Sequence, residues 1–220
     1  CKSKNKNEIH SADELAFKAN NLIPDLTNVF KEISSCLINS KLKHMFNTYA
    51  FFAGGCIRNQ LLNLPVNDYD LYFNCSNFIT KELIEIMEFA RKHGSEMCWN
   101  SKLTLLMQSE NAYTFQMESQ DGVKIIQFIT KFSESSPQKF IDNFDYTNSM
   151  CYFLPQNHKM HLDYRMIESL QYMILTFNSK CWSPLQSMRR MLKFHAQGFK
   201  VPNETIIQLT ESLRGVTADQ

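Results

Sequence analysis

Two aspartates and a pair of glycines carry the clearest chemical signal in this sequence. Gly54 and Gly55 follow an apolar run, and Asp68 and Asp70 lie two positions apart within a second run of strand-forming residues. Residues two apart on a β-strand share one face, so the two carboxylates are expected to stand side by side and to repel unless a cation lies between them. Hard oxygen ligands of this kind suit Mg²⁺ (or Mn²⁺) bound together with a nucleoside triphosphate.

The elements that must position these residues are short and clearly bounded. The apolar run Tyr49–Ala53 predicts a buried strand, and Ile57–Leu64 predicts a short helix that Pro65 ends. The run Tyr69–Phe73 predicts a second strand. Paired glycines let the backbone approach a ligand, and the start of a helix attracts anions. Each feature alone is common: a glycine pair is usually turn chemistry, and an Asp-x-Asp is usually a solvated strand face.

The combination resembles a known signature. The segment GGCIRNQLLN…DYD is similar to the pattern GGxxRDxLLG…DxD of the polymerase β-like nucleotidyltransferases, and more narrowly to the class II tRNA nucleotidyltransferases and bacterial poly(A) polymerases. Asn59 stands where that family usually has Asp. The resemblance implies that Asp68 and Asp70 are catalytic and hold the metal ions. It implies that the triphosphate is positioned by Gly54, Gly55 and Arg58.

A second segment, FDYTNSMCY at Phe144–Tyr152, is similar to the family motif RRDFTINALAY, which helps to bind the triphosphate and sugar. The resemblance implies that Asp145 and Asn148 contact the nucleotide. The two arginines of the motif are missing, because Asn143 and Phe144 occupy their places. Other basic residues must then neutralise the phosphate charge, and the candidates for this role are Arg58, Lys131 and Lys139. From the residues alone, this segment is as typical of a loop as of a strand.

A helix predicted over Leu185–Gln197 resembles the neck motif of the class II enzymes. The resemblance implies that Arg190 and Lys193 approach the triphosphate, although a core-facing helix with a solvated basic side would look the same. The family's base-reading motif Glu-Asp-x-x-Arg is lost, since its places hold Ser183, Pro184 and Ser187.

The predicted strand Val123–Phe132 is where such a domain would place its third strand, and many of these enzymes carry a third carboxylate there. This sequence offers the neutral Gln127 instead. We interpret the segment as a core strand with one polar face, and a contact between Gln127 and a nucleotide is the alternative. Two aspartates are enough to hold metal if the triphosphate supplies the other oxygens.

The composition and charge of the chain limit the classes of function that it can have. The 220 residues carry a net charge of +1, so overall charge does not favour binding of long nucleic acid, although a local patch would. No apolar run reaches the length of a membrane span and no signal peptide is visible. Seven scattered cysteines without a CxxC pair indicate free thiols in a reducing cytoplasm. The chain starts at Cys1, not Met, so we expect a trimmed start.

We expect an α+β fold: a polymerase β-like nucleotidyltransferase head with a mixed sheet and N-terminal helices over residues 1–163, then a small helical neck over 164–220. The segment His161–Asp163 resembles the hairpin that joins the two. We expect disorder over Cys1–Glu8 and a loose tail from Arg214. A helix capped by Ser11 is expected to break near Pro24 and to resume over Asp25–Leu42, and further helices are expected over Thr80–Lys92 and Thr205–Leu213. The expected strands are Leu103–Met107, Ala112–Met117 and Val123–Ile129.

The resemblance covers Ala50–Leu213 and implies a metal-dependent nucleotidyltransferase that moves a nucleotide from a nucleoside triphosphate to a hydroxyl acceptor. The acceptor expected from the family is an RNA 3′ end, tRNA-like, and a protein hydroxyl is the other possibility. The length leaves no room for the body and tail domains that grip tRNA in the full-length enzymes. The alternative is a catalytically inactive binding or interaction module, which Gln127 and the lost motifs favour. The sequence does not indicate an oligomeric state.

Overall fold

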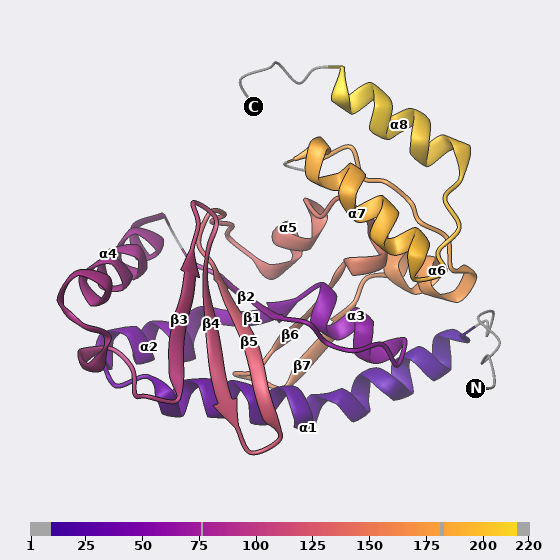
Figure 1. Ribbon diagram of the computed structural model, residues 1–220. Coiled ribbons are helices and arrows are strands. Elements are labelled where there is room, and N and C mark those ends of the chain that lie inside the picture. The colour runs from indigo at the N-terminus through magenta and orange to yellow at the C-terminus, as the bar shows by residue number, and fades with distance from the viewer. Residues whose placement is uncertain (1–9, 76, 181–182, 215–220) are drawn as a thin grey trace.

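The computed structural model describes residues 10–75, 77–180 and 183–214. Its centre is a seven-stranded sheet in the order β3-β4-β5-β2-β1-β6-β7 (Figure 1). Strands β2 and β5 pair in parallel and the other neighbours pair antiparallel, so the sheet is mixed and the predicted α+β class is confirmed. The strands are β1 Ala50–Ala53, β2 Tyr69–Phe73, β3 Leu103–Gln108, β4 Ala112–Ser119, β5 Gly122–Ile129, β6 Cys151–Leu154 and β7 Lys159–Leu162.

Helices surround this sheet, and in Figure 1 α1 runs beneath it while α7 lies on the opposite side. Two short 3₁₀ turns, η1 and η2, complete the regular structure of the described residues. The bounds are α1 Ala12–Cys36, α2 Ser40–Tyr49, α3 Gly55–Leu61, α4 Asn77–His93, η1 Ser95–Met97, α5 Pro137–Asp142, η2 Thr147–Ser149, α6 Tyr164–Tyr172, α7 Pro184–Ala196 and α8 Asn203–Leu213.

Side-chain alternation gives the sheet an apolar face that packs on α1 and α2. The rings of Phe30 in α1 and Phe46 in α2 stack with centroids 4.4 Å apart, and Phe46 lies 5.7 Å from Phe128 of β5. Phe52 of β1 also meets Phe30, at 6.2 Å. Since neighbouring positions of a strand point to opposite faces, this packing fixes which residues of β1, β2 and β5 point away from α1.

The N-terminal region departs from its prediction. Ser11 caps α1 by accepting the Glu14 amide, as predicted. The predicted break near Pro24 is wrong, because α1 continues through Pro24 and ends at Cys36 instead of Leu42. Pro24 is exposed and removes only one backbone donor, while the buried residues on either side of it hold the helix to the sheet. Asn39 then caps α2, a helix that the sequence analysis does not predict.

Helices α3, α4, α7 and α8 and strands β1 to β5 agree with the prediction to within a few residues, whereas the short helix α5 was not predicted. Gly198, with a φ of 100°, follows the C-terminal end of α7. At the start of α6, Asp163 caps the helix by accepting a hydrogen bond from the Arg165 amide. The β6–β7 pair forms the expected hairpin before α6. The boundary between head and neck at residue 163 stays a prediction. The expected disorder of Cys1–Glu8 and most of the tail after Arg214 lie outside the described residues.

The structure tests two expectations from the composition, one about the cysteines and one about membrane-spanning segments. The five cysteines within the described ranges are buried and free of disulfides, as predicted; they are Cys36, Cys56, Cys75, Cys98 and Cys151. In the same ranges, every helix is too short or too polar to cross a bilayer.

Replacing Phe46 with Ala tests the apolar face of the sheet. Phe46 is fully buried between α1 and β5, so Phe46→Ala should lower the free energy of unfolding by about 3–5 kcal/mol through lost burial and a residual cavity. Urea denaturation measures the loss. The control is Phe17→Ala on α1, where the ring is 67% exposed and the expected change is below about 0.5 kcal/mol. Equal losses in both variants would contradict this packing.

Candidate active site

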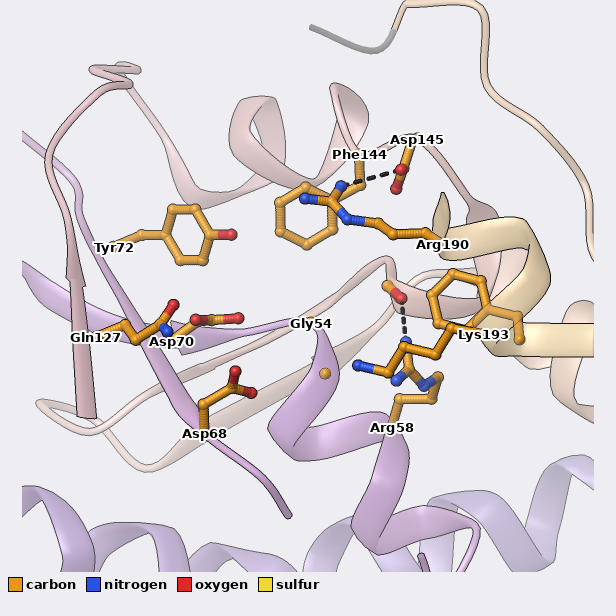
Figure 2. A pocket seen from close by; sticks show the side chains of 13 residues that line it. Gly54, Arg58, Asp68, Asp70, Tyr72, Gln127, Phe144, Asp145, Arg190 and Lys193 are labelled. Atoms are coloured by element: carbon orange, nitrogen blue, oxygen red, sulfur yellow. Dashed lines mark hydrogen bonds and ion pairs between the residues drawn. The ribbon is translucent and has the colours of Figure 1, made fainter. Parts of the chain in front are cut away.

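The two aspartates come together because of the alternation along β2. Asp68 precedes the strand, and Asp70 and Tyr72 follow at a spacing of two, while Leu71 and Phe73 are buried on the other face. All three side chains line one cavity of about 240 Å³ (Figure 2). The rest of the lining comes from other elements and consists of Gly54, Gly55, Arg58, Gln127, Phe144, Asp145, Ser149, Arg190, Lys193 and Phe194.

Gln127 lies beside Asp70 in this cavity. The parallel pairing of β2 with β5 sets Asp70 opposite Gln127 in register, and both face the cavity. A neutral amide therefore occupies the position that the resemblance assigns to a third carboxylate in many such enzymes. The amide adds one oxygen and one NH₂ group to the carboxylate side of the cavity.

Gly54 forms the bend between β1 and α3. Its φ of 75° is a conformation that residues with a Cβ rarely adopt, and an added Cβ would lie 3.3 Å from the Phe144 ring. The Gly54 amide donates to the Cys151 carbonyl at 3.1 Å, which ties the bend to β6. Because α3 spans only seven residues, its dipole is a weak attraction for an anion, and charged side chains must provide most of it.

Arg58 is a buried cation at the wall of the cavity. Only 3% of the residue is exposed, and Phe194 of α7 packs on its guanidinium at 4.5 Å. The guanidinium donates to Asn59 Oδ1 at 2.7 and 3.1 Å and to Ser149 Oγ at 2.7 Å. Burial lowers the pKa of Arg58 to about 10. No carboxylate among the described residues forms an ion pair with it, so an anionic ligand would be a favourable partner.

Helix α7 brings two further cations to the cavity. Arg190 Nη1 donates to Asp145 Oδ2 at 2.9 Å (Figure 2). Burial disfavours the charged guanidinium, but the charge and hydrogen bond of Asp145 outweigh it and raise the pKa of Arg190. Lys193 lies one turn further on and makes no ion pair within the described part of the chain. Figure 2 places Asp68 and Asp70 across the cavity from Arg58 and Lys193, with Gly54 between the two sides.

Most of the residues predicted for the site gather here, and three candidates do not. Asn148 is fully buried and does not line the cavity. Its Oδ1 accepts a hydrogen bond from Ser149 Oγ at 3.0 Å, and its Nδ2 has no partner among the described residues. Lys131 and Lys139 also lie outside the lining. Ser187 is buried, and its hydroxyl donates to the Ser183 carbonyl.

Four lining residues were not predicted: Tyr72, Phe144, Ser149 and Phe194. Tyr72 carried a usable signal, since it continues the two-residue spacing of Asp68 and Asp70 on β2. Ser149 and Phe194 meet only through Arg58, and nothing in the local sequence indicates that contact.

Burial and charge perturb the acidic side of the cavity. Burial, followed by the charge of Asp68, raises the pKa of Asp70 from 3.8 to about 7, while Arg190, Lys193 and Arg58 oppose that rise. Burial and the neighbouring Asp70 also raise the pKa of the Tyr72 hydroxyl well above its usual value. Burial raises the pKa of the Cys151 thiol to about 12, so this thiol is not a nucleophile at neutral pH.

The donor set fits a hard divalent cation that a ligand helps to hold. In the described ranges, no cluster of three or more His, Cys, Asp or Glu side chains forms a complete metal site. Asp68 and Asp70 supply two carboxylates on one face, and Mg²⁺ is commonly bound by one or two carboxylates with phosphates and waters completing its shell. Burial is the larger cause of the raised pKa of Asp70, and a cation between the two aspartates would relieve the second cause, repulsion by Asp68.

Asp70→Asn should stabilise the metal-free protein in a pH-dependent way. Because the folded-state pKa of Asp70 is about 7 and its ordinary value is 3.8, the folded wild type holds the proton more tightly and loses stability as pH rises from about 4 to 7. The Asn variant lacks this loss, so its advantage should be small at pH 4 and largest at pH 8. Urea unfolding in EDTA measures it, with the exposed Asp121→Asn as control. An advantage independent of pH would refute this electrostatic account.

Comparison with solved structures shows the fold. A Thermotoga maritima CCA-adding enzyme complexed with tRNA superimposes with a TM-score of 0.52 at 15% identity, covering 94% of this chain and 45% of that one. A CCA-adding enzyme in its apo form gives a TM-score of 0.53 at 14% identity, covering 92% of this chain and 45% of that one. A complex of CCA-adding enzyme with ATP gives 0.53 at 15%, with the same coverage. The chain thus has the nucleotidyltransferase fold of these enzymes and spans less than half of their length.

Sequence comparison identifies a different family from the class II tRNA nucleotidyltransferases expected above. A curated relative named Gabija anti-defense 2, from Bacillus phage SPbetaL7, is 24% identical over 168 residues. The match covers 76% of this chain and 38% of that relative. The family model described as Gabija anti-defense 2 family protein matches residues 26–172, which is more than half of the chain. The chain therefore belongs to the Gabija anti-defense 2 family.

Proposed function

We propose that this chain is a metal-dependent nucleotidyltransferase that moves a nucleotide from a nucleoside triphosphate to a hydroxyl acceptor. The observation that carries the proposal is the opposition of charges across one cavity. Asp68, just before β2, and Asp70 of β2 face Arg58 of α3 and Lys193 of α7. A metal–triphosphate complex has the complementary pattern, since its cation suits the carboxylates and its phosphates suit the guanidinium and ammonium groups.

Each side chain has a defined part in this proposal. Asp68 and Asp70 hold Mg²⁺ (or Mn²⁺), and Arg58 and Lys193 bind and orient the phosphates. A bound metal pair of this kind would activate the acceptor hydroxyl and stabilise charge on the leaving pyrophosphate. The backbone at Gly54 approaches the phosphates closely because no Cβ stands in the way.

We propose an RNA 3′ end, tRNA-like, as the acceptor, and a protein hydroxyl as the other candidate. The fold similarity to CCA-adding enzymes solved with tRNA and with ATP supports the RNA acceptor. The family name supports a role against a defence system called Gabija, and we propose that nucleotide transfer serves that role. Since the matched region is 38% of the curated relative, the rest of such a protein would have further contacts of its own.

A catalytically inactive nucleotide-binding module is the second candidate function. It is favoured by the neutral Gln127 beside Asp70 and by the engagement of Asp145 with Arg190. Calorimetry with Mg²⁺ and each nucleoside triphosphate, run beside a transfer assay, separates the two candidates. Binding without turnover supports the module, and metal-dependent turnover excludes it.

The aspartate pair should be essential for transfer. In a reaction of protein, Mg²⁺, nucleoside triphosphates labelled at the α-phosphate, and total RNA or total protein, Asp68→Asn/Asp70→Asn should lower label transfer by about 10³-fold or more, because the metal ligands are removed. Asp121→Asn, whose carboxylate is 89% exposed on the β4–β5 hairpin, should transfer as the wild type does. Undiminished transfer by the double variant would reject the assignment.

Lys193 should contribute to triphosphate affinity through its charge. Lys193→Met should raise the dissociation constant for a metal–triphosphate complex by about tenfold, corresponding to about 1.4 kcal/mol, since one charge-assisted contact is lost. The matched control is Arg189→Met on the same helix, which is exposed and lies outside the cavity lining. Equal weakening by the two variants would mean that the overall charge of α7, and not Lys193, attracts the ligand.

A further inference from the structure

A second hollow lies on the other side of the sheet from the candidate active site. It has a volume of about 360 Å³, within the range typical of small-molecule sites. Three segments line it: the C-terminal half of α1, one side of α2 from Lys43 to Asn47, and the turn between β6 and β7. Its lining is Thr27, Phe30, Lys31, Ser34, Ser35, Lys43, Asn47, Pro155 and His158.

The lining carries basic groups and no acidic one. Lys31 from α1 and Lys43 from α2 both reach the hollow, and neither forms an ion pair among the described residues. Glu32, the acid next to Lys31 in sequence, is engaged elsewhere by Lys124 and Ser119. The Ser34 hydroxyl donates to Asn47 Oδ1 and the Ser35 hydroxyl donates to the Glu32 carbonyl, so these hydroxyls are already engaged. The two ammonium groups and the NH₂ group of Asn47 remain as donors that suit a phosphate.

The third wall of the hollow, the β6–β7 turn, is held in place by hydrogen bonds within the protein. Gln156 in the β6–β7 turn donates to the carbonyls of Asn47 and Ala50 at 3.2 and 2.8 Å, which anchors the turn to the end of α2. The Nδ1 atom of His158 lies 3.2 Å from the Thr27 hydroxyl of α1. These contacts join the three segments, so the hollow needs no rearrangement to form.

The hollow also has an apolar part. The Phe30 side chain, which stacks on Phe46 beneath it, and the buried Pro155 contribute carbon surface beside the lysines. A phosphate ester with an apolar ring would use both features, with the ring against the 8% of Phe30 that is exposed and the phosphate on the lysines. We propose that this α1/α2 hollow binds a nucleotide through its phosphate, either free or as part of a single-stranded nucleic acid.

This site is separate from the candidate active site and does not rest on the function proposed above. Its residues come from α1, α2 and the β6–β7 turn, whereas Asp68, Asp70 and Gln127 line the cavity on the face of the sheet opposite to the buried Leu71 and Phe128. None of the residues that line one cavity lines the other. A protein without any transferase activity would still bind nucleotides at the α1/α2 hollow.

Charge reversal at the two lysines tests the site. Calorimetry in EDTA would use four probes: inorganic phosphate, adenosine 5′-monophosphate, a single-stranded hexauridylate and a phosphoserine peptide. Lys31→Glu/Lys43→Glu should weaken binding of the nucleotide probes by tenfold or more. The matched control is Lys81→Glu/Lys92→Glu on α4, which makes the same change in net charge at two exposed lysines without ion pairs and should stay within twofold of the wild type. Circular dichroism confirms that both variants fold.

The outcomes distinguish the sources of the phosphate. Tighter binding of the monophosphate supports a free nucleotide, and tighter binding of the hexauridylate supports a nucleic acid strand. Equal losses in the two double variants would overturn the proposal, because they would show attraction by net charge alone. A phosphoserine peptide that binds more tightly than both nucleotide probes, or wild-type protein that binds none of them at millimolar concentration, would also overturn it.

Discussion

The candidate site depends on how strand β2 divides its side chains between two environments. Leu71 and Phe73 are buried toward α1 and α2, and this burial holds the register of the strand. The same register forces Asp68 and Asp70 onto the opposite face, where they lie close enough for the charge of one to raise the pKa of the other. Packing free energy on one face of the sheet thus maintains an unfavourable pair of anions on the other.

Contacts between distant segments supply the opposite charges. Arg58 of α3 bonds to Ser149 and packs on Phe194 of α7, and Arg190 of α7 bonds to Asp145. The Tyr146 hydroxyl donates to the Ser187 carbonyl at 2.9 Å, which fixes α7 against the segment that carries Asp145. The site therefore contains like charges on each of two sides, and a ligand that carries both signs would relieve both repulsions at once.

The parts of this arrangement that local sequence determines could be predicted. The spacing of Asp68 and Asp70 within an apolar run indicated a shared face, and the glycine pair indicated the bend before a helix. The break predicted at Pro24 was wrong because tertiary packing held the helix despite the lost hydrogen bond. The exclusion of Asn148 from the cavity could not be predicted, since adjacent residues of a 3₁₀ turn point in different directions and only the surrounding packing decides which one faces the cavity.

The most direct test of the central claim is a crystal structure of this protein with Mg²⁺ and a non-hydrolysable nucleoside triphosphate analogue. The account predicts a metal ion at about 2.0–2.1 Å from carboxylate oxygens of both Asp68 and Asp70, with the phosphates extending toward Arg58 and Lys193. A metal bound away from these aspartates would contradict the account, as would a triphosphate lodged outside the cavity next to Gly54.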